Sequence, residues 1–176
     1  MTLIEEMEAY AKAYDVPIMQ KEGIDFMCAF LNEHKLTRIL EIGSAIGYSA
    51  IRMAMLHPDI HVTTIERDEE RYAKAVEFVE RSGLQEQITL LYGDALETNV
   101  EGSYDMLFID AAKAQYTRFF ERYEPLLIQG GYVITDNLNF HGLVEHQETI
   151  TSRTLRSLVR KIGNFVEYLK QREDYD

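Results

Sequence analysis

The stretch that decides the fold is ILEIGSAIGYSA, residues 39–50. A short apolar run leads into a loop bounded by Gly43 and Gly47, and a helical pattern follows. Strand, glycine loop and helix in this order are typical of folds that hold a nucleotide at a helix N-terminus. The dinucleotide fingerprint G-x-G-x-x-G is incomplete, because Ser-Ala-Ile separates the two glycines. The stretch therefore predicts a nucleoside ligand and leaves its identity open.

Apolar segments alternate with helical segments along the rest of the chain. Such alternation is typical of parallel βαβ units with right-handed crossovers. We expect a single α/β domain over residues 1–176, with a helical N-terminal cap at 1–35 and a doubly wound, mainly parallel Rossmann-like sheet, covered by helices on both faces, at 36–176. The expected strands are 38–43, 61–66, 88–94, 104–110 and 130–137, and the expected helices are 3–14, 20–34, 47–56, 68–82, 113–127 and 151–171.

The composition of the chain indicates a globular protein and argues against a membrane or secreted protein. Hydrophobic residues make up 46% of the chain and charged residues 27%, as in a soluble globular domain. No apolar run reaches the roughly 18 residues of a membrane span, which argues against a membrane partner. The N-terminus lacks the pattern of a secretory signal, and the single cysteine, Cys28, fits a reducing cytoplasm.

The formal net charge of −12 argues against non-specific binding to nucleic acid. The most basic short window is residues 153–161, RTLRSLVRK. On a helix, Arg153, Arg156 and Arg160 share one face because they are three and four residues apart. That face is either a solvated surface or, for an RNA substrate, a set of phosphate contacts.

Every predicted strand carries an acidic or amide residue at or near its carboxyl end, and a parallel sheet brings those ends to one rim. Single Asp and Asn residues also cap helices and form turns, but capping alone does not explain five that converge. The rim residues are Glu41, Glu66, Asp94, Asp110, and Asp136 with Asn137.

The first strand ends suit a nucleoside. Loop amides from Gly43 to Gly47 are placed to meet an anionic group, and Glu66 is placed to accept hydrogen bonds from ribose hydroxyls. A dinucleotide, S-adenosylmethionine (SAM) or another nucleoside would fit this pattern. The missing middle glycine weakens the dinucleotide option, whereas Ser49 and the loop amides suit the carboxylate of a methionine-derived tail.

The last strand ends suggest a metal. Asp110, Asp136 and Asn137 offer hard oxygen ligands of the kind that Mg²⁺ prefers, although caps and turns would also account for them. Lys113 follows Asp110 by three residues, in the first turn of a predicted helix. A lysine there is unfavourable for the helix dipole, which favours a catalytic or anion-binding role.

Several segments resemble the class I SAM-dependent O-methyltransferases of the cation-dependent catechol and caffeoyl-CoA type. They are LEIGSAIGYSAIRMA, TIERDEERYAKA, GLQEQITLLYGDA, FIDAAKAQY and GGYVITDN, and they cover most of residues 36–145 in the family's order. VPIM (16–19), FFERYEPLL and RSLVRKI are similar to the bacterial subgroup that methylates 5-hydroxyuridine in tRNA. Nicotinamide-dependent oxidoreductases remain a distant alternative.

The resemblance implies a site and partners. It implies Mg²⁺ or a similar cation on Asp110, Asp136 and Asn137, and a catalytic Lys113 near the reacting oxygen. It further implies a homodimer that acts on a tRNA anticodon loop or, alternatively, on a small catechol; a non-catalytic SAM-binding protein is a third possibility. Met19 and Tyr48 rest on the resemblance alone. The implied SAM site is Met19, Glu41, Gly43, Tyr48, Ser49, Glu66, Asp94, Ala95 and Asp110.

One departure from the family pattern is expected. Members of the family complete the sheet with an antiparallel hairpin of two further strands. Residues 172–176, REDYD, leave no room for that hairpin, so we expect it to be missing and strand 130–137 to lie at an edge of the sheet.

Overall fold

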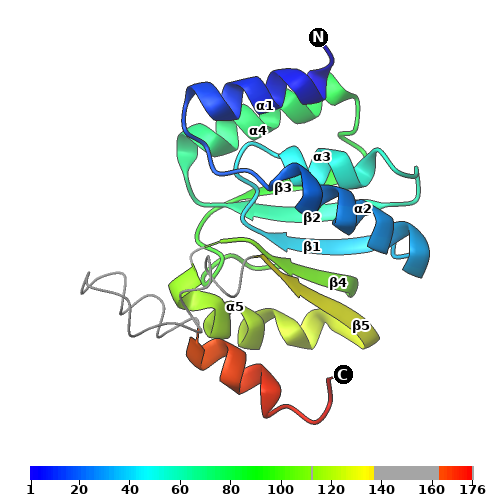
Figure 1. Ribbon diagram of the computed structural model, residues 1–176, viewed down its shortest axis with the longest axis vertical. Helices are drawn as coiled ribbons and strands as arrows, with labels where there is room; N and C mark the ends of the chain where they lie inside the picture. Colours follow the sequence, from blue (N-terminus) through cyan, green and yellow to red (C-terminus); the bar gives the residue numbers. More distant parts are fainter. Residues whose placement is uncertain (112, 137–162, 176) are drawn as a thin grey trace.

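The fold is a parallel sheet between two layers of helices. The computed structural model describes residues 1–111, 113–136 and 163–175. Within these residues five parallel strands pair in the order β3-β2-β1-β4-β5, which confirms the predicted doubly wound α/β class (Figure 1). The strands are β1 (Arg38–Ile42), β2 (His61–Glu66), β3 (Ile88–Tyr92), β4 (Tyr104–Ile109) and β5 (Leu127–Thr135).

The helices follow the predicted order, with one exception. The segment expected as a single helix over 113–127 is an α-helix flanked by two 3₁₀ turns, and β5 begins at Leu127. Pro125 lies at the start of the second turn, where its missing N–H disfavours continuation of the α-helix. The helices are α1 (Leu3–Ala13), α2 (Lys21–His34), α3 (Tyr48–Ala54), α4 (Glu69–Ser82), η1 (Lys113–Gln115), α5 (Tyr116–Tyr123) and η2 (Glu124–Leu126).

Residues 163–170 form a further helix, which corresponds to the end of the predicted helix 151–171. The start of that predicted helix, with the basic window 153–161, lies outside the described residues. No helix in the described part of the chain is both long and apolar enough to cross a bilayer.

Alternating strand residues separate the core into two clusters. Ile39 and Phe108 face the cluster that packs against α1, α2, α3 and α4. Leu40 and Leu107 face the cluster that contains α5 and Phe165 of the last helix. The period of two therefore buries both faces of the sheet, as a sheet with helices on each side requires (Figure 1).

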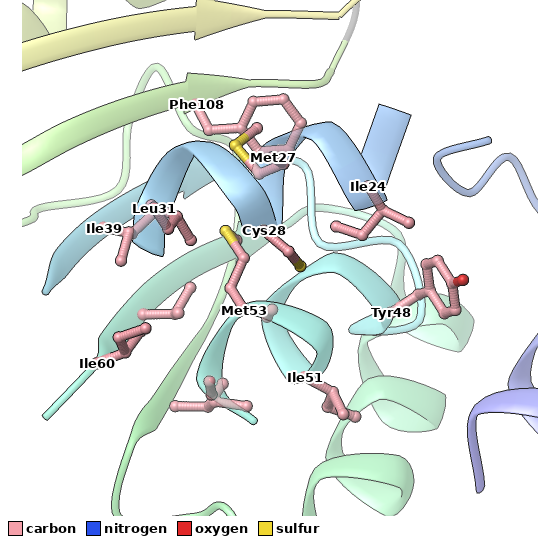
Figure 2. Packing of buried hydrophobic residues seen from close by; sticks show 14 of the residues in the cluster. Ile24, Met27, Cys28, Leu31, Ile39, Tyr48, Ile51, Met53, Ile60 and Phe108 are labelled. Carbon is pink, nitrogen blue, oxygen red and sulfur yellow. The ribbon is translucent and has the colours of Figure 1, made fainter. Parts of the chain in front are cut away.

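Figure 2 shows the first cluster around α2. Ile24, Met27, Cys28 and Leu31 recur at helical spacing and are buried against β1, α3 and Phe108 of β4. The sequence pattern of α2 is thus a core pattern. This packing brings the segment that joins α1 to α2 close to the carboxyl ends of the strands, where Met19 lines a cavity.

Candidate functional site

A cavity of about 420 Å³ opens at the carboxyl ends of the strands. It lies where the chain order of the sheet reverses between β1 and β4, the position at which open α/β sheets bind ligands. Its lining is Pro17, Ile18, Met19, Ile42, Gly43, Ser44, Ala45, Tyr48, Ser49, Ile65, Glu66, Arg67, Arg71, Gly93, Asp94, Ala95, Asp110, Ala111, Phe119 and Asp136.

Gly43 is required where the loop after β1 passes the end of β4. Its φ is +101°, and a Cβ atom there would lie 1.9 Å from the backbone oxygen of Asp110. No side chain fits such a gap, so the glycine brings the loop into close contact with the strand end that carries Asp110. Gly47, the N-cap of α3, has a φ of +84°.

Four of the five loop N–H groups from Gly43 to Gly47 donate to acceptors within the protein. The N–H groups of Gly43 and Ser44 both donate to the Ile65 carbonyl, at 3.0 and 3.1 Å, and Gly47 N–H donates to the Ser44 carbonyl at 2.8 Å. Ala45 N–H donates to Glu66 Oε2 at 2.8 Å. The tight turn satisfies these four donors internally, so they are not available to an anion, which corrects that part of the prediction. The loop shapes the cavity wall.

Glu66 lies at the end of β2 with its carboxylate at the cavity. Oε2 accepts the Ala45 N–H, and Oε1 accepts the Asp68 N–H at 2.9 Å. A carboxylate has about four acceptor positions, so both oxygens retain capacity for ligand hydroxyls. The two backbone bonds fix the orientation of the side chain, which favours the predicted role toward ribose hydroxyls.

Glu41 lies behind the cavity wall and is fully buried. Its carboxylate accepts hydrogen bonds from Ser49 Oγ and, at 2.6 Å, from Thr64 Oγ1, which in turn lies 2.6 Å from Ser44 Oγ. Burial raises the pKa of Glu41 to about 7, against the lowering effect of the two hydroxyls, and the nearby carboxylate of Asp110 adds to the rise. Glu41 does not line the cavity, whereas Ser49, which donates to it, does. The predicted contact of Glu41 with a ligand would therefore be indirect, through Ser49.

The loop after β3 is held against α5. Asp94 Oδ1 accepts the Leu96 N–H at 2.8 Å, and the Asp94 carbonyl accepts the Thr98 hydroxyl at 2.7 Å. The Tyr123 hydroxyl donates to the Ala95 carbonyl from α5. These bonds fix the positions of Asp94 and Ala95, which both line the cavity.

Asp110 and Asp136 end neighbouring strands and both line the cavity. Asp110 N–H donates to the Ile42 carbonyl at 2.9 Å, and Asp136 N–H donates to the Ile109 carbonyl at 3.3 Å, which extends the ladder and sets the two residues side by side. The Tyr116 hydroxyl donates to the Asp136 carbonyl at 3.1 Å. Burial raises the pKa of Tyr116, and the charges of both carboxylates add to the rise. Two hard oxygen donors at one end of the cavity fit a divalent cation.

The third predicted ligand, Asn137, lies outside the described residues. Within the described residues no group of three or more His, Cys, Asp or Glu side chains is arranged to hold a metal ion. Lys113 begins η1, three residues after Asp110, as the sequence predicted. Metal ligation and the role of Lys113 therefore stay predictions.

Sequence reasoning missed part of the cavity wall. Pro17 and Ile18 precede Met19 in the VPIM segment, so their contribution could have been inferred from that neighbour. Arg67 follows Glu66 directly, and Arg71 lies one helical turn later in α4, where a residue facing the strand end is expected. Phe119 of α5 gives no such signal, because helical spacing identifies it as a core residue.

The chain is similar to known O-methyltransferases in sequence. The sequence model of the O-methyltransferase family matches residues 2–173. Caffeoyl-CoA O-methyltransferase of Populus kitakamiensis is 28% identical over 156 residues, which are 81% of this chain and 65% of that protein. The chain spans between 52% and 65% of the length of three curated relatives, all described as caffeoyl-CoA O-methyltransferases, one of them provisionally.

Two solved structures are similar over nearly the whole chain. A Staphylococcus aureus protein, provisionally described as a caffeoyl-CoA O-methyltransferase, is 40% identical with a TM-score of 0.92, covering 98% of this chain and 84% of its own. An O-methyltransferase of Bacillus cereus, solved in complex with SAH, is 27% identical with a TM-score of 0.84, covering 97% and 80%.

Proposed function

We propose that this chain, which belongs to the O-methyltransferase family, transfers a methyl group from SAM to a hydroxyl oxygen. The observation that carries the proposal is the cavity that gathers Glu66, Asp110 and Asp136 at the reversal point of the sheet. The SAH complex of the Bacillus cereus relative supports the choice of ligand, because SAH is what remains of SAM after methyl transfer.

Three parts of the cavity would hold SAM. Glu66 would accept hydrogen bonds from the ribose hydroxyls, and Asp94 with Ala95 would meet the base, while Met19, Tyr48 and Ser49 would surround the amino-acid tail. Glu41 would hold the Ser49 hydroxyl in place from behind. When bound, SAM supplies a methyl group that its sulfonium already activates.

Asp110 and Asp136, with the predicted Asn137, would hold a divalent cation such as Mg²⁺. When bound, the cation orients two adjacent substrate oxygens and lowers the pKa of the reacting hydroxyl. In the transfer the oxygen–carbon bond forms, the sulfur–carbon bond breaks and the hydroxyl proton leaves. Lys113 would accept that proton if neutral and stabilise the oxyanion if charged.

For the acceptor we propose O5 of 5-hydroxyuridine at the tRNA wobble position, which would become 5-methoxyuridine. The resemblance of VPIM and RSLVRKI to the tRNA-modifying subgroup supports it, and a wobble base in a single-stranded loop is readily splayed into a pocket. A small catechol is the second candidate, favoured by the names of the caffeoyl-CoA relatives. Both acceptors present two adjacent oxygens.

The homodimer that the resemblance implies also remains a prediction.

Calorimetry tests the cofactor. We expect SAM and SAH to bind to the purified protein and NAD to show no measurable heat of binding. A matched variant, Glu66→Gln, should weaken SAH binding, because it exchanges a charged acceptor for a neutral one. Tight NAD binding without SAM binding would rule out the methyltransferase.

Methyl incorporation tests the chemistry and the acceptor. The protein is incubated with SAM, Mg²⁺ and either 5-hydroxyuridine-containing tRNA or a catechol, and products are read by mass spectrometry. We expect EDTA or Asp136→Ala to abolish transfer, while Asp59→Ala, which removes an exposed carboxylate, should not. Transfer that persists in EDTA would contradict the metal mechanism, and methylation of the catechol alone would favour the second candidate.

A further inference from the structure

Tyr48 connects the cavity to the N-terminal helices by hydrogen bonds. Tyr48 begins α3, lines the cavity and is 2% exposed. Its hydroxyl donates to Glu8 Oε1 of α1 at 2.6 Å. A hydroxyl bonded to a carboxylate forms one of the stronger hydrogen bonds in proteins. This hydrogen bond therefore links a cavity residue to the first helix, forty positions earlier in the sequence.

Arg52 extends this connection to α2. It lies one turn after Tyr48 in α3, and its Nη1 donates to the Tyr48 hydroxyl at 3.1 Å. Its Nη2 donates to Asp25 Oδ1 of α2 at 2.8 Å. We name these four residues, Glu8, Tyr48, Arg52 and Asp25, the N-terminal clasp. The clasp ties both helices of the N-terminal cap to the helix that follows the glycine loop.

The segment between the two helices forms part of the cavity wall. Residues 14–20 join α1 to α2 and contribute Pro17, Ile18 and Met19 to the lining. Asp15 in this segment has a φ of +53°, and Val16 N–H donates to the Ala11 carbonyl at 2.9 Å, so the chain reverses tightly after α1. The position of the three wall residues therefore depends on how α1 and α2 are docked.

A second set of contacts holds α1 in place without touching the cavity. Arg81 Nη1 of α4 donates to Glu6 Oε1 at 2.7 Å, and Tyr10 packs edge-on against Phe78 with ring centroids 5.9 Å apart. The contact of α1 with α4 and its contact with the cavity residue Tyr48 thus use different residues of the same helix. The two contacts can be removed separately by mutation.

We propose that Glu8 is a positioning residue, which acts through Tyr48 to align the cavity wall for SAM. The proposal rests on the proposed function. Burial raises the pKa of Tyr48 to about 12, and the bond to Glu8 adds to the rise, so the phenol remains a donor throughout the neutral range. Without Glu8 this nearly buried donor loses its carboxylate and the wall loses its link to α1.

The test compares Glu8→Ala with Glu6→Ala by calorimetry with SAH and by steady-state kinetics. We expect Glu8→Ala to raise the Kd for SAH and the KM for SAM about five- to tenfold, with kcat within about twofold, as the loss of one charge-assisted bond implies. Glu6→Ala removes the hydrogen bonds between α1 and Arg81 of α4 and should lower the melting temperature while leaving Kd unchanged.

Two further variants keep the test interpretable. Glu8→Gln retains an acceptor oxygen and should restore most of the affinity. Tyr48→Phe keeps the ring in place and should match Glu8→Ala, and the double variant should lose no more than either single one. Equal losses for Glu6→Ala and Glu8→Ala, or wild-type affinity in Glu8→Ala and Tyr48→Phe, would overturn this proposal alone. Failure of the wild-type protein to bind SAH would instead overturn the proposed function and this inference with it.

Discussion

Glu41 shows how one buried carboxyl links the site to the stability of the protein. Burial raises its pKa to about 7, from an ordinary value of 4.5. In the folded state the group therefore keeps a proton over a pH range in which the unfolded chain has lost it. Its contribution to stability is complete below about pH 4.5 and is lost as the pH rises through 7.

We predict that Glu41→Gln removes this pH dependence. Between pH 5 and pH 8 the free energy of unfolding of the wild type should fall relative to that of the variant by on the order of 2–3 kcal/mol. Urea denaturation at several pH values measures the difference, with the exposed Glu86→Gln as a control. Parallel profiles for the wild type and Glu41→Gln would contradict the raised pKa.

Gly43 and Gly83 illustrate two different reasons why a position requires glycine: a close backbone contact and a left-handed conformation. Both have positive φ, but a Cβ on Gly43 would meet the Asp110 backbone at 1.9 Å, whereas one on Gly83 would meet nothing within 4 Å. We predict that Gly43→Ala costs more than about 3 kcal/mol of unfolding free energy, because the backbone must move. Gly83→Ala should cost about 1 kcal/mol, which reflects the left-handed conformation alone. Equal costs in urea denaturation would refute this account of Gly43.

At the scale of elements, α2 has two faces with different functions. Met27 is fully buried against the sheet (Figure 2), whereas Phe26 on the outer face is 63% exposed. The two residues are adjacent in the same helix and differ in what surrounds them: Met27 packs in the core and Phe26 faces outward. The docking of α2 depends on the inner face, and the wall segment 14–20 depends on that docking.

We predict that Met27→Ala lowers the free energy of unfolding by about 2–5 kcal/mol, because it leaves a cavity in the core. It should also weaken SAH binding, since α2 carries one end of the wall segment. Phe26→Ala should change stability by less than about 1 kcal/mol. Thermal unfolding and calorimetry of the two variants measure both effects, and a similar cost for the two would contradict the assignment of faces.

At the scale of the whole molecule, the cavity joins segments that are distant in sequence. Its lining comes from the N-terminal cap, from the carboxyl ends of all five described strands and from α3, α4 and α5. Because these segments come together only in the folded protein, a ligand that fills the cavity should stabilise the whole folded state. Binding to the native state alone adds about 2.7 kcal/mol when the ligand is present at 100 times its Kd.

We predict that saturating SAH raises the melting temperature by several degrees and that NADH at the same concentration does not. For SAH, the shift should grow with the logarithm of ligand concentration. A shift of equal size in Glu66→Gln would indicate binding elsewhere. Differential scanning fluorimetry of the wild type and of this variant makes the comparison.

The order of elements could be predicted from the sequence because the periodicities are local. Strands of period two and helices of period 3.6 alternate, and a parallel sheet necessarily collects the carboxyl ends of its strands on one rim. The chain order of Glu66, Asp94, Asp110 and Asp136, each at a strand end, is therefore sufficient to assign them to one site. Their ligand roles remain predictions, as does that of Asn137.

Tertiary structure decided what lies between those ends. The sequence placed the loop amides at an anion and Glu41 at the ligand, but the fold turns the amides toward Ile65 and Glu66 and sets Glu41 behind Ser49. Likewise, no local pattern pairs Glu8 with Tyr48. Periodicity determines which face of an element is buried, whereas the partner of a polar group depends on three-dimensional packing between segments distant in sequence.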